Sequence, residues 1–309
     1  MRMDVSFPSD GANLAGHLYL PSGMDMTQCR PALVVVHPFG GVKEQTAGLY
    51  AKKLAERGFI TLAFDARYQG ESGGEPRYLE DPFARVEDIK NAVTYLSNHT
   101  QIDADKIGVL GICAGGGYVP FAAQTDHRIR AVATVSASDI GTLFREGLNG
   151  NAGPEVLASM LDESAKARTA EGQGEPPSYY NIVPVPDSAA EITPDTPALY
   201  AEGSNYYRTS RAQHPNSPNL FLKQSVDRIA QYSSYDFIHL ISPRPLLMIA
   251  GSEADTRYFS EMAVFRANEP KELFLIEGAS HIALYDQPEY VNSAVEKITT
   301  FFAAHLSSN

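Results

Sequence analysis

Short apolar runs alternate with amphipathic stretches along the first part of the chain. The runs occupy residues 32–37, 59–64, 107–112 and 131–135. Continuous apolar runs of this length are typical of strands that are buried on both faces, as in a parallel sheet. We therefore predict four buried strands in this region. A weaker alternation over residues 14–20 indicates a further strand before them.

The stretches between the apolar runs show helical periodicity. Residues 46–57 predict a helix that ends at Gly58, and apolar side chains repeat on one helical face over residues 85–96. A third helix is expected over residues 114–124. Strands and helices thus alternate, which is the pattern of βαβ units with right-handed crossovers. The sequence predicts an α/β fold with a mostly parallel central sheet flanked by helices.

Residues 140–236 interrupt this alternation. They contain Pro-rich and Asn-rich stretches with short helical segments, for example residues 155–165 and 225–232. Five of the 16 tyrosines lie between Tyr179 and Tyr207. The tyrosines of a loop-rich insertion would pack onto the core, whereas those of a cap would line a substrate cavity with rings and hydroxyls. We assign residues 140–236 to a cap or lid insertion.

The strand and helix signals return after this segment. They predict a strand at 245–251, a helix at 257–268, a strand at 272–276 and an amphipathic helix after Pro288. The two parts of the chain, residues 1–139 and 237–309, are therefore expected to build one α/β core around a single sheet.

The composition narrows the class of protein and its partners. Of the 309 residues, 43% are hydrophobic and 20% charged, which is typical of a globular protein. No apolar run approaches the about 20 residues that span a bilayer, and the N-terminus lacks the apolar stretch of a signal peptide. We expect a cytoplasmic protein. The formal net charge of −12 disfavours nucleic acid and membranes as partners, and a homodimer is favoured by general frequency alone.

The candidate chemistry begins at Cys113, which stands in Gly-Ile-Cys-Ala-Gly-Gly (residues 111–116) between a predicted strand and helix. This is the form of a nucleophile elbow, with Cys where Ser is commoner. Gly111 and Gly115 allow neighbouring backbone to approach closely. The N-terminus of the following helix favours a thiolate. A buried, unreactive cysteine beside a turn is the alternative, but the strand–turn–helix context favours a nucleophile.

A nucleophile of this kind needs a base, and in a fold with this elbow the order is nucleophile, acid, histidine. His281 follows the last predicted strand and precedes the last helix, where a base can reach the elbow. His214, His239 and His305 are the remaining histidines in suitable order. We therefore predict His281 as the base.

The acid is expected in the loop after Gly251. Asp255 and Glu253 both qualify. Asp255 is preferred because it lies deeper in the loop and its shorter side chain gives a more rigid hold, although it could instead cap the next helix. Glu253 stays open as the alternative.

The oxyanion of an acyl-transfer intermediate needs backbone donors. The N–H of Ala114 directly follows the nucleophile, and the loop after the first buried strand offers a second donor. Pro38 in that loop has no N–H, so Phe39 is the expected donor, with Gly40 as the next candidate.

Together these features resemble the α/β-hydrolase fold. The resemblance rests on the order of elements, the elbow, the His-Pro-Phe-Gly-Gly loop at 37–41, the polar loop at 65–72 and the Gly-Ala-Ser-His segment at 278–281. It implies an α/β-hydrolase fold with a cap insertion. It also implies a nucleophile at Cys113, a base at His281 and an acid after Gly251.

Two branches of that superfamily share parts of the sequence. The Gly-x-Cys-x-Gly-Gly elbow is similar to that of dienelactone hydrolases. Residues 37–45 and 251–261 look more like a bacterial group related to fungal polyketide transferases. The large insertion departs from dienelactone hydrolases.

These observations predict a cysteine-dependent acyl hydrolase acting on an ester, lactone or thioester of a small molecule through a covalent acyl-enzyme. An acyltransferase with a non-water acceptor and a noncatalytic small-molecule-binding protein are the alternatives. No cofactor is expected, because no Gly-rich dinucleotide or phosphate fingerprint follows a strand. No metal is expected, because the histidines are scattered and no Cys-x-x-Cys or His-x-x-x-His pair occurs.

Overall fold

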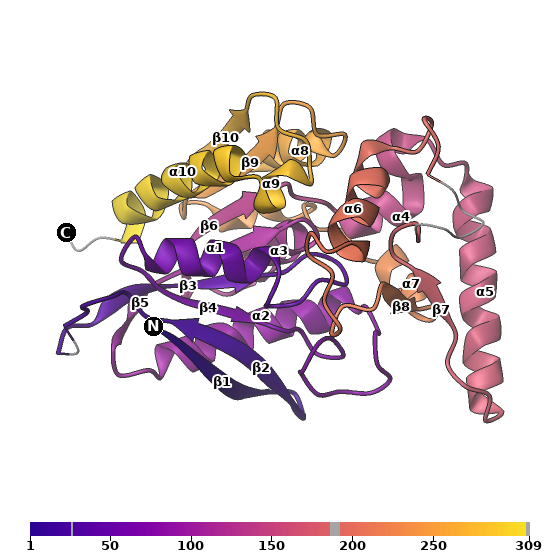
Figure 1. The fold of residues 1–309 in the computed structure, drawn as a ribbon, viewed down its shortest axis with the longest axis horizontal. Coiled ribbons are helices and arrows are strands. Elements are labelled where there is room, and N and C mark those ends of the chain that lie inside the picture. Colours follow the sequence, from indigo (N-terminus) through magenta and orange to yellow (C-terminus); the bar gives the residue numbers. More distant parts are fainter. Residues whose placement is uncertain (26, 186–191, 307–309) are drawn as a thin grey trace.

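A computed structural model describes residues 1–25, 27–185 and 192–306 of the chain. The described residues form an eight-stranded sheet with the order β1-β2-β4-β3-β5-β6-β9-β10 (Figure 1). Its strands are β1 (Arg2–Ser9), β2 (Ala12–Tyr19), β3 (Arg30–Val36), β4 (Ile60–Phe64), β5 (Ile102–Ile112), β6 (Ile129–Val135), β9 (Leu246–Gly251) and β10 (Lys271–Ile276). The hairpin β1–β2 is antiparallel and β2 pairs antiparallel with β4, whereas the strands from β4 to β10 are parallel. The predicted mostly parallel sheet is confirmed.

β1 is the strand that the apolar pattern did not predict. It lies at the edge of the sheet, and most of its side chains are exposed. An exposed edge strand needs no apolar run, so its sequence carries little signal.

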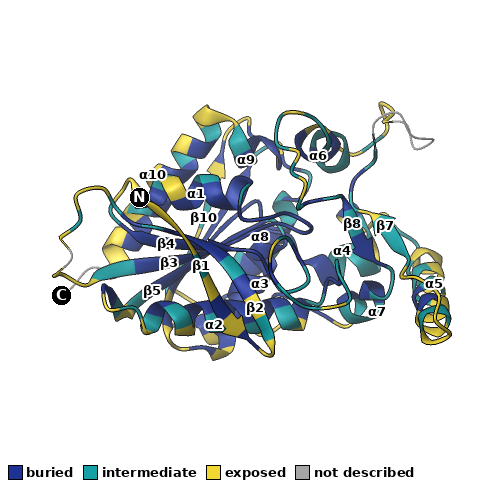
Figure 2. Ribbon diagram, turned by 60° about the horizontal axis from the view of Figure 1, so that its bottom comes forward, coloured by how far each residue is buried: buried dark blue, intermediate teal, exposed yellow. Residues whose placement is uncertain are grey.

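Helices cover both faces of the sheet (Figures 1 and 2). One face carries α2 (Pro82–Ser97), α3 (Gly115–Thr125) and α8 (Arg257–Arg266), and the other carries α1 (Thr46–Ala55) and α10 (Pro288–Leu306). Successive strand residues alternate between the two cores, so that Val34 belongs to the first and Val35 to the second. Burial on both faces explains why the central segments of these strands are almost wholly apolar.

The segment between β6 and β9 forms a separate group of elements, at the right of Figure 1. It contains α4 (Ile140–Glu146), η1 (Leu148–Gly150), α5 (Pro154–Gly172), β7 (Tyr179–Asn181), α6 (Ala198–Arg208), β8 (Leu220–Leu222) and α7 (Ser225–Ala230). The short 3-10 helix η2 (Ile238–Ile241), just before β9, packs against α3 and α8 of the core. β7 and β8 pair as a small antiparallel sheet. No helix among the described residues combines the length and apolar character needed to cross a membrane.

The parallel register brings the loops after several strands to one edge of the sheet. Val36 at the end of β3 pairs with Gly111 of β5, and Val135 at the end of β6 pairs with both Ile112 and Ile249. The chain segments that follow these strands therefore start side by side. They are the segments in which the sequence places its candidate residues.

Candidate active site

Cys113 lies in a sharp turn between β5 and α3. Its φ angle is 55°, in the left-handed region that non-glycine residues seldom occupy. A Cβ atom at Gly111 would lie 2.1 Å from the carbonyl oxygen of Gly115, and one at Gly115 would lie 2.6 Å from the carbonyl oxygen of Val36. Both glycines are thus required by close backbone contacts. The strained residue and its two glycines match the predicted elbow, since strain of this kind concentrates at functional sites.

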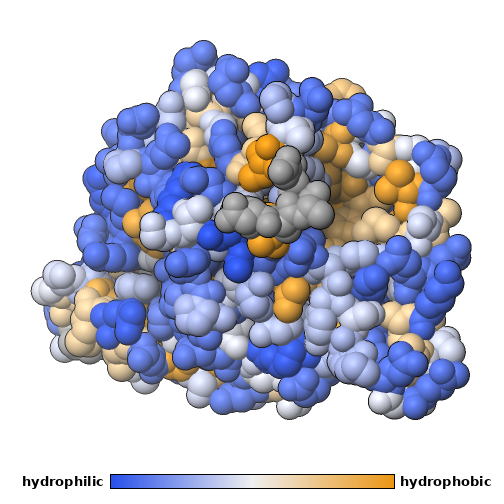
Figure 3. Space-filling view, turned by 45° about the vertical axis from the view of Figure 1, so that its right-hand side comes forward, coloured by the Kyte–Doolittle hydropathy of each residue, from blue (hydrophilic) through white to orange (hydrophobic). Residues whose placement is uncertain are grey.

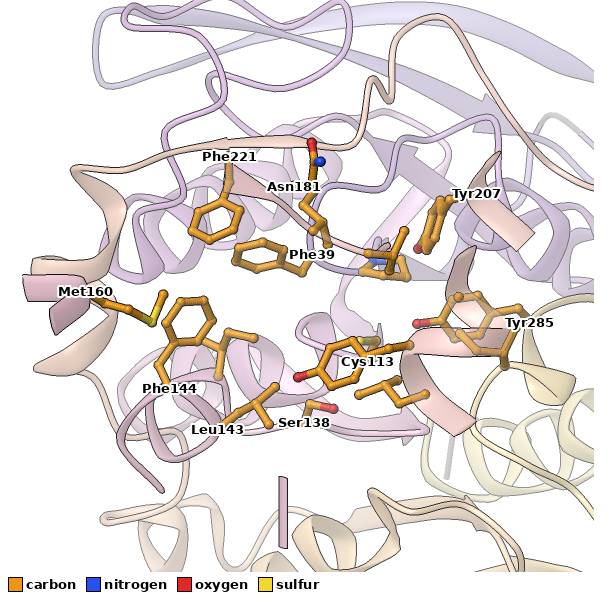
Figure 4. A pocket seen from close by; sticks show the side chains of 18 residues that line it. Phe39, Cys113, Ser138, Leu143, Phe144, Met160, Asn181, Tyr207, Phe221 and Tyr285 are labelled. Carbon is orange, nitrogen blue, oxygen red and sulfur yellow. The ribbon is translucent and has the colours of Figure 1, made fainter. Parts of the chain in front are cut away.

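The Cys113 thiol is partly exposed and opens onto a cavity (Figure 4). Burial raises its pKa above the usual value, and hydrogen bonds from the Tyr285 hydroxyl and the N–H groups of Ala114 and Phe39 oppose that rise. Burial thus opposes the predicted effect of the helix N-terminus, which favours the thiolate. The two N–H groups predicted for the oxyanion both lie beside the sulfur.

The loop that carries Phe39 is held in place by the buried guanidinium of Arg85. Arg85 of α2 donates to the carbonyl oxygen of His37 at 2.7 Å, and a second nitrogen of its guanidinium lies 2.8 Å from Nε2 of the His37 imidazole. The carbonyl of Gly40, the other candidate donor residue, accepts a hydrogen bond from the Ser217 hydroxyl at 2.7 Å. These contacts fix the loop between the core and the segment 140–236.

His281 reaches the same site from the loop after β10. Its side chain is buried, with 1% exposed, and desolvation lowers its pKa to about 3. The imidazole is therefore neutral at physiological pH and can accept a proton. Nδ1 lies 2.5 Å from the hydroxyl oxygen of Thr256, and Nε2 lies 3.1 Å from the hydroxyl oxygen of Tyr285.

The acid predicted in the β9 loop does not hydrogen-bond His281. Oδ2 of Asp255 accepts from the N–H of Leu199, at 2.9 Å, in the first turn of α6. Burial raises the Asp255 pKa. Glu253 is exposed, and its Oε1 accepts from the Ser252 hydroxyl. In this turn the buried Thr256 faces the imidazole, while Asp255 faces the segment 140–236.

Two contacts of His281 were not anticipated from the sequence. Thr256 adjoins the predicted acid but carries no separate signal, because a threonine after a strand is common. Tyr285 lies four residues after His281, in the short helix α9 (Ala283–Asp286). The i, i+4 spacing places the two side chains together when a helical turn follows the histidine, and this spacing was the available clue.

The cavity above Cys113 has a volume of about 240 Å³. Its apolar wall is formed by Pro38, Phe39, Ile140, Leu143, Phe144, Met160, Ile182, Val183, Leu199, Phe221 and Ile282, and its polar side chains are those of Ser138, Asn181, Tyr200, Tyr207 and Tyr285. The described residues that line it include no Asp, Glu, Lys, Arg or His. Its titratable groups are the Cys113 thiol and the phenols of the tyrosines. On this side of the molecule, Figure 3 shows apolar side chains gathered around a hollow.

The tyrosines of residues 179–207 were predicted either to pack onto the core or to line a substrate cavity, and the structure shows both. Tyr200 and Tyr207 line the cavity, whereas Tyr206 is buried against the rings of Tyr207 and Tyr285. Part of the cluster is thus available to a ligand and part packs onto the core.

A second polar cluster lies in the loops after β3 and β4. Oxygens of Glu44, Asp65 and Glu71 lie within 4.8 Å of one another, which is the spacing of a possible cation site. The Lys43 ammonium lies between them, at 2.7, 2.8 and 2.7 Å from the three carboxylates. The Lys43 ammonium therefore occupies the position between the carboxylates that a cation would take, and its three ion pairs brace the loop.

Comparison with known proteins agrees with this geometry. A family model described as "alpha/beta hydrolase fold" matches residues 31–288. The chain belongs to the α/β-hydrolase family. It is 40% identical to the protein YcjY of Escherichia coli K12, over 99% of this chain and 100% of that protein. A crystal structure of the protein PA2218 from Pseudomonas aeruginosa has a TM-score of 0.91 at 35% identity, covering 99% of this chain and 94% of that one.

Relatives with functional names are more distant α/β-hydrolase homologues. A polyketide transferase of Stachybotrys chlorohalonatus is 30% identical over 91% of this chain and 90% of its own length. A thiohydrolase of Aspergillus aculeatus is 29% identical over 89% of this chain and 84% of its own length. The resemblance to polyketide transferases is confirmed, and that to dienelactone hydrolases stays a prediction.

In this α/β-hydrolase Thr256 contacts the His281 imidazole, whereas Asp255 contacts the backbone of α6. Replacing Thr256 with valine leaves a buried ring nitrogen of His281 without a partner, which costs about 1–3 kcal/mol. We expect Thr256→Val to lower kcat/KM for acyl substrates by about ten- to a hundred-fold, and Asp255→Asn to lower it less. Steady-state kinetics of both variants checks this order. A larger loss in Asp255→Asn would assign the acid to Asp255, as the sequence predicted.

Proposed function

We propose that the protein is a cysteine-dependent acyl hydrolase that transfers the acyl group of a thioester or ester onto Cys113. The observation that carries this proposal is the elbow thiol with two backbone N–H groups beside it and a neutral, buried imidazole in the same site. Nucleophile, oxyanion donors and base are the parts that acyl transfer needs. The names of the thiohydrolase and polyketide transferase relatives agree with this class of reaction.

The first half-reaction would acylate the enzyme. The Cys113 sulfur attacks the carbonyl carbon while its proton passes to His281. The N–H groups of Ala114 and Phe39 hold the oxyanion of the tetrahedral intermediate. The intermediate then expels the thiol or alcohol, which takes the proton from His281.

The second half-reaction would release the acyl group. Water attacks the acyl-enzyme carbonyl and gives a proton to His281, and the collapse of the second intermediate returns that proton to the sulfur. The products are the carboxylic acid and the free enzyme. The high pKa of Cys113 suits this cycle, because the thiol needs to be deprotonated only as it attacks.

We infer that residues 140–236 form a cap that selects the acyl group. Leu143, Phe144, Met160 and Phe221 of this segment line the cavity together with Phe39 of the core (Figure 4). Burial of each CH₂ group of an acyl chain in such a wall contributes about 0.8 kcal/mol. The absence of a cation among the described lining residues disfavours an anionic acyl group. The preferred substrates are therefore neutral, apolar acyl thioesters or esters.

A matched pair of substrates tests this specificity. Hexanoyl and adipoyl thioesters of the same thiol have six-carbon acyl chains and differ by a terminal carboxylate. We expect kcat/KM for the hexanoyl thioester to exceed that for the adipoyl thioester by at least about 100-fold, because an unpaired charge in an apolar cavity costs several kcal/mol. Spectrophotometric release of the thiol measures both rates. Equal rates would contradict an apolar acyl site.

Acyl transfer is the second candidate function. The apolar wall beside Cys113 favours it, because such a wall holds few water molecules near the acyl-enzyme. The polyketide transferase names of relatives point the same way. Chromatography of the products formed with and without an added alcohol or amine distinguishes the two functions. Free acid as the main product in both cases supports hydrolysis, and an ester or amide formed at the expense of the acid supports transfer.

A further inference from the structure

The Tyr285 hydroxyl lies between the candidate nucleophile and the candidate base. It is 3.1 Å from Nε2 of His281, and it lines the same cavity as the Cys113 thiol, close enough for each group to shift the pKa of the other. Nδ1 of the imidazole is occupied by Thr256. Both ring nitrogens are therefore engaged, and the nitrogen that would serve as the base meets the Tyr285 phenol.

The Tyr285 side chain is held firmly in this position. It is 1% exposed, and its ring packs against those of Tyr206 and Tyr207 at centroid distances of 5.2 and 6.3 Å. Its carbonyl accepts from the Thr46 hydroxyl at 3.0 Å, and the Tyr50 hydroxyl donates to the neighbouring Leu284 carbonyl at 2.7 Å. The two hydroxyls of α1 thereby satisfy buried carbonyls of α9, while the ring contacts with Tyr206 and Tyr207 hold the phenol in place.

We propose that Tyr285 is a catalytic residue that relays the proton between Cys113 and His281, an inference that rests on the proposed function. As the sulfur attacks, the S–H proton moves to the Tyr285 oxygen while the phenolic proton moves to Nε2 of His281. The tyrosine ends as it began, with one proton, and the net change is a thiol proton gained by the imidazole. The reverse transfer restores the thiol when the acyl group leaves.

The acid–base properties of Tyr285 agree with a concerted relay. Burial raises its pKa well above the usual value, with nearby Cys113 and Tyr207 adding to the rise. A free phenolate is therefore disfavoured, and the hydroxyl must take one proton as it gives the other. A buried tyrosine with a structural role alone would need no contact with the thiol.

Two variants separate the relay from packing. Tyr285→Phe keeps the ring and removes the hydroxyl, and Tyr50→Phe removes a buried hydroxyl that contacts the same helix without reaching the thiol. We expect Tyr285→Phe to lower kcat for a hexanoyl thioester by about 100-fold with KM within about two-fold. Tyr50→Phe should stay within about three-fold of wild type. Thermal unfolding of both variants checks that they fold.

The pH dependence of Cys113 alkylation is a second measurement. A purely structural role of Tyr285 would not change it. The rate of alkylation by iodoacetamide is followed from pH 5 to 11, with peptide mapping to separate Cys113 from Cys29. We expect the inflection for Cys113 to lie about one pH unit higher in Tyr285→Phe, because the thiolate loses a donor. An unchanged inflection together with wild-type kcat overturns the relay. So does an equal loss in Tyr50→Phe.

A measurement on the wild type keeps the inference testable if Tyr285→Phe does not fold. The acylation rate is measured in mixtures of light and heavy water. If two protons move in the same step, a plot of this rate against the deuterium fraction of the solvent is curved. A linear dependence overturns the relay. If these tests fail while Cys113→Ala is inactive, the proposed function stands without Tyr285, whereas an active Cys113→Ala removes both.

Discussion

Replacing Cys113 with alanine is expected to lower kcat/KM for neutral acyl thioesters by about 10⁴-fold or more. In the proposed mechanism the thiol supplies the attacking atom, and no other described side chain in the cavity is placed in a strained elbow between two backbone N–H groups. Without it, the remaining site still binds the acyl group and holds its oxyanion. That residual site sustains only the small part of catalysis that survives loss of a nucleophile.

The matched control for this prediction is Cys29→Ala. Cys29 is exposed, and its sulfur lies 3.5 Å from the carbonyl oxygen of Thr100, away from the cavity residues. We expect kcat/KM of this variant to equal that of wild type. Thiol release from the thioester is measured over the same range of substrate concentrations for wild type, Cys113→Ala and Cys29→Ala. Undiminished turnover in Cys113→Ala would rule out cysteine catalysis.

Replacing His281 with glutamine is expected to lower kcat/KM by about 10²- to 10⁴-fold, the range for loss of a positioned base. The imidazole is buried and neutral at pH 7, since desolvation lowers its pKa to about 3, so that it can accept a proton. Glutamine keeps polar contacts with Thr256 and Tyr285 but cannot take up the proton of the thiol. Both acylation and release of the acyl group should therefore slow.

His239→Gln is the control for His281→Gln. His239 is exposed in η2 and was one of the alternative bases in the sequence. We expect its replacement to leave kcat/KM unchanged. The pH dependence of kcat/KM adds a second readout, because wild type should keep its activity well below pH 6.5, where an unperturbed histidine would lose it. An unchanged rate in His281→Gln would remove this residue from the mechanism.

Much of the core was predictable because its signals are local. A strand segment that is buried on both faces is almost wholly apolar, so the buried parts of β3, β4, β5 and β6 appear as nearly continuous apolar runs. The elbow is equally local, since the close contacts of Gly111 and Gly115 allow no side chain at either position. Parallel register then brings the ends of these strands together without further information.

The partners of His281 were harder to predict because they depend on the direction of single side chains. Asp255 and Thr256 are adjacent in one turn, and the packing of α6 takes the carboxylate while the hydroxyl meets the imidazole. Tyr285 enters the site only because the chain after His281 turns into α9. Residue type favours the carboxylate over the hydroxyl in the first case, and the i, i+4 spacing of His281 and Tyr285 has meaning only once the helical turn after His281 is known.

The cavity wall shows the same limit on a larger scale. Phe39 of the core meets Phe144 and Phe221 from residues 140–236 at ring-centroid distances of 6.2 and 5.2 Å. These contacts join positions more than 100 residues apart. The sequence indicated a cap from its loss of alternation, but which aromatic side chains would face the thiol follows from tertiary packing alone.

The central claim is a covalent acyl group on Cys113, and the mass of the enzyme during turnover tests it most directly. Wild-type protein is mixed with a hexanoyl thioester, quenched in acid within milliseconds, digested and analysed by mass spectrometry. We predict a peptide containing Cys113 that carries one hexanoyl group, absent in Cys113→Ala. Steady turnover with no acylated peptide, or with the acyl group on another residue, would contradict the account.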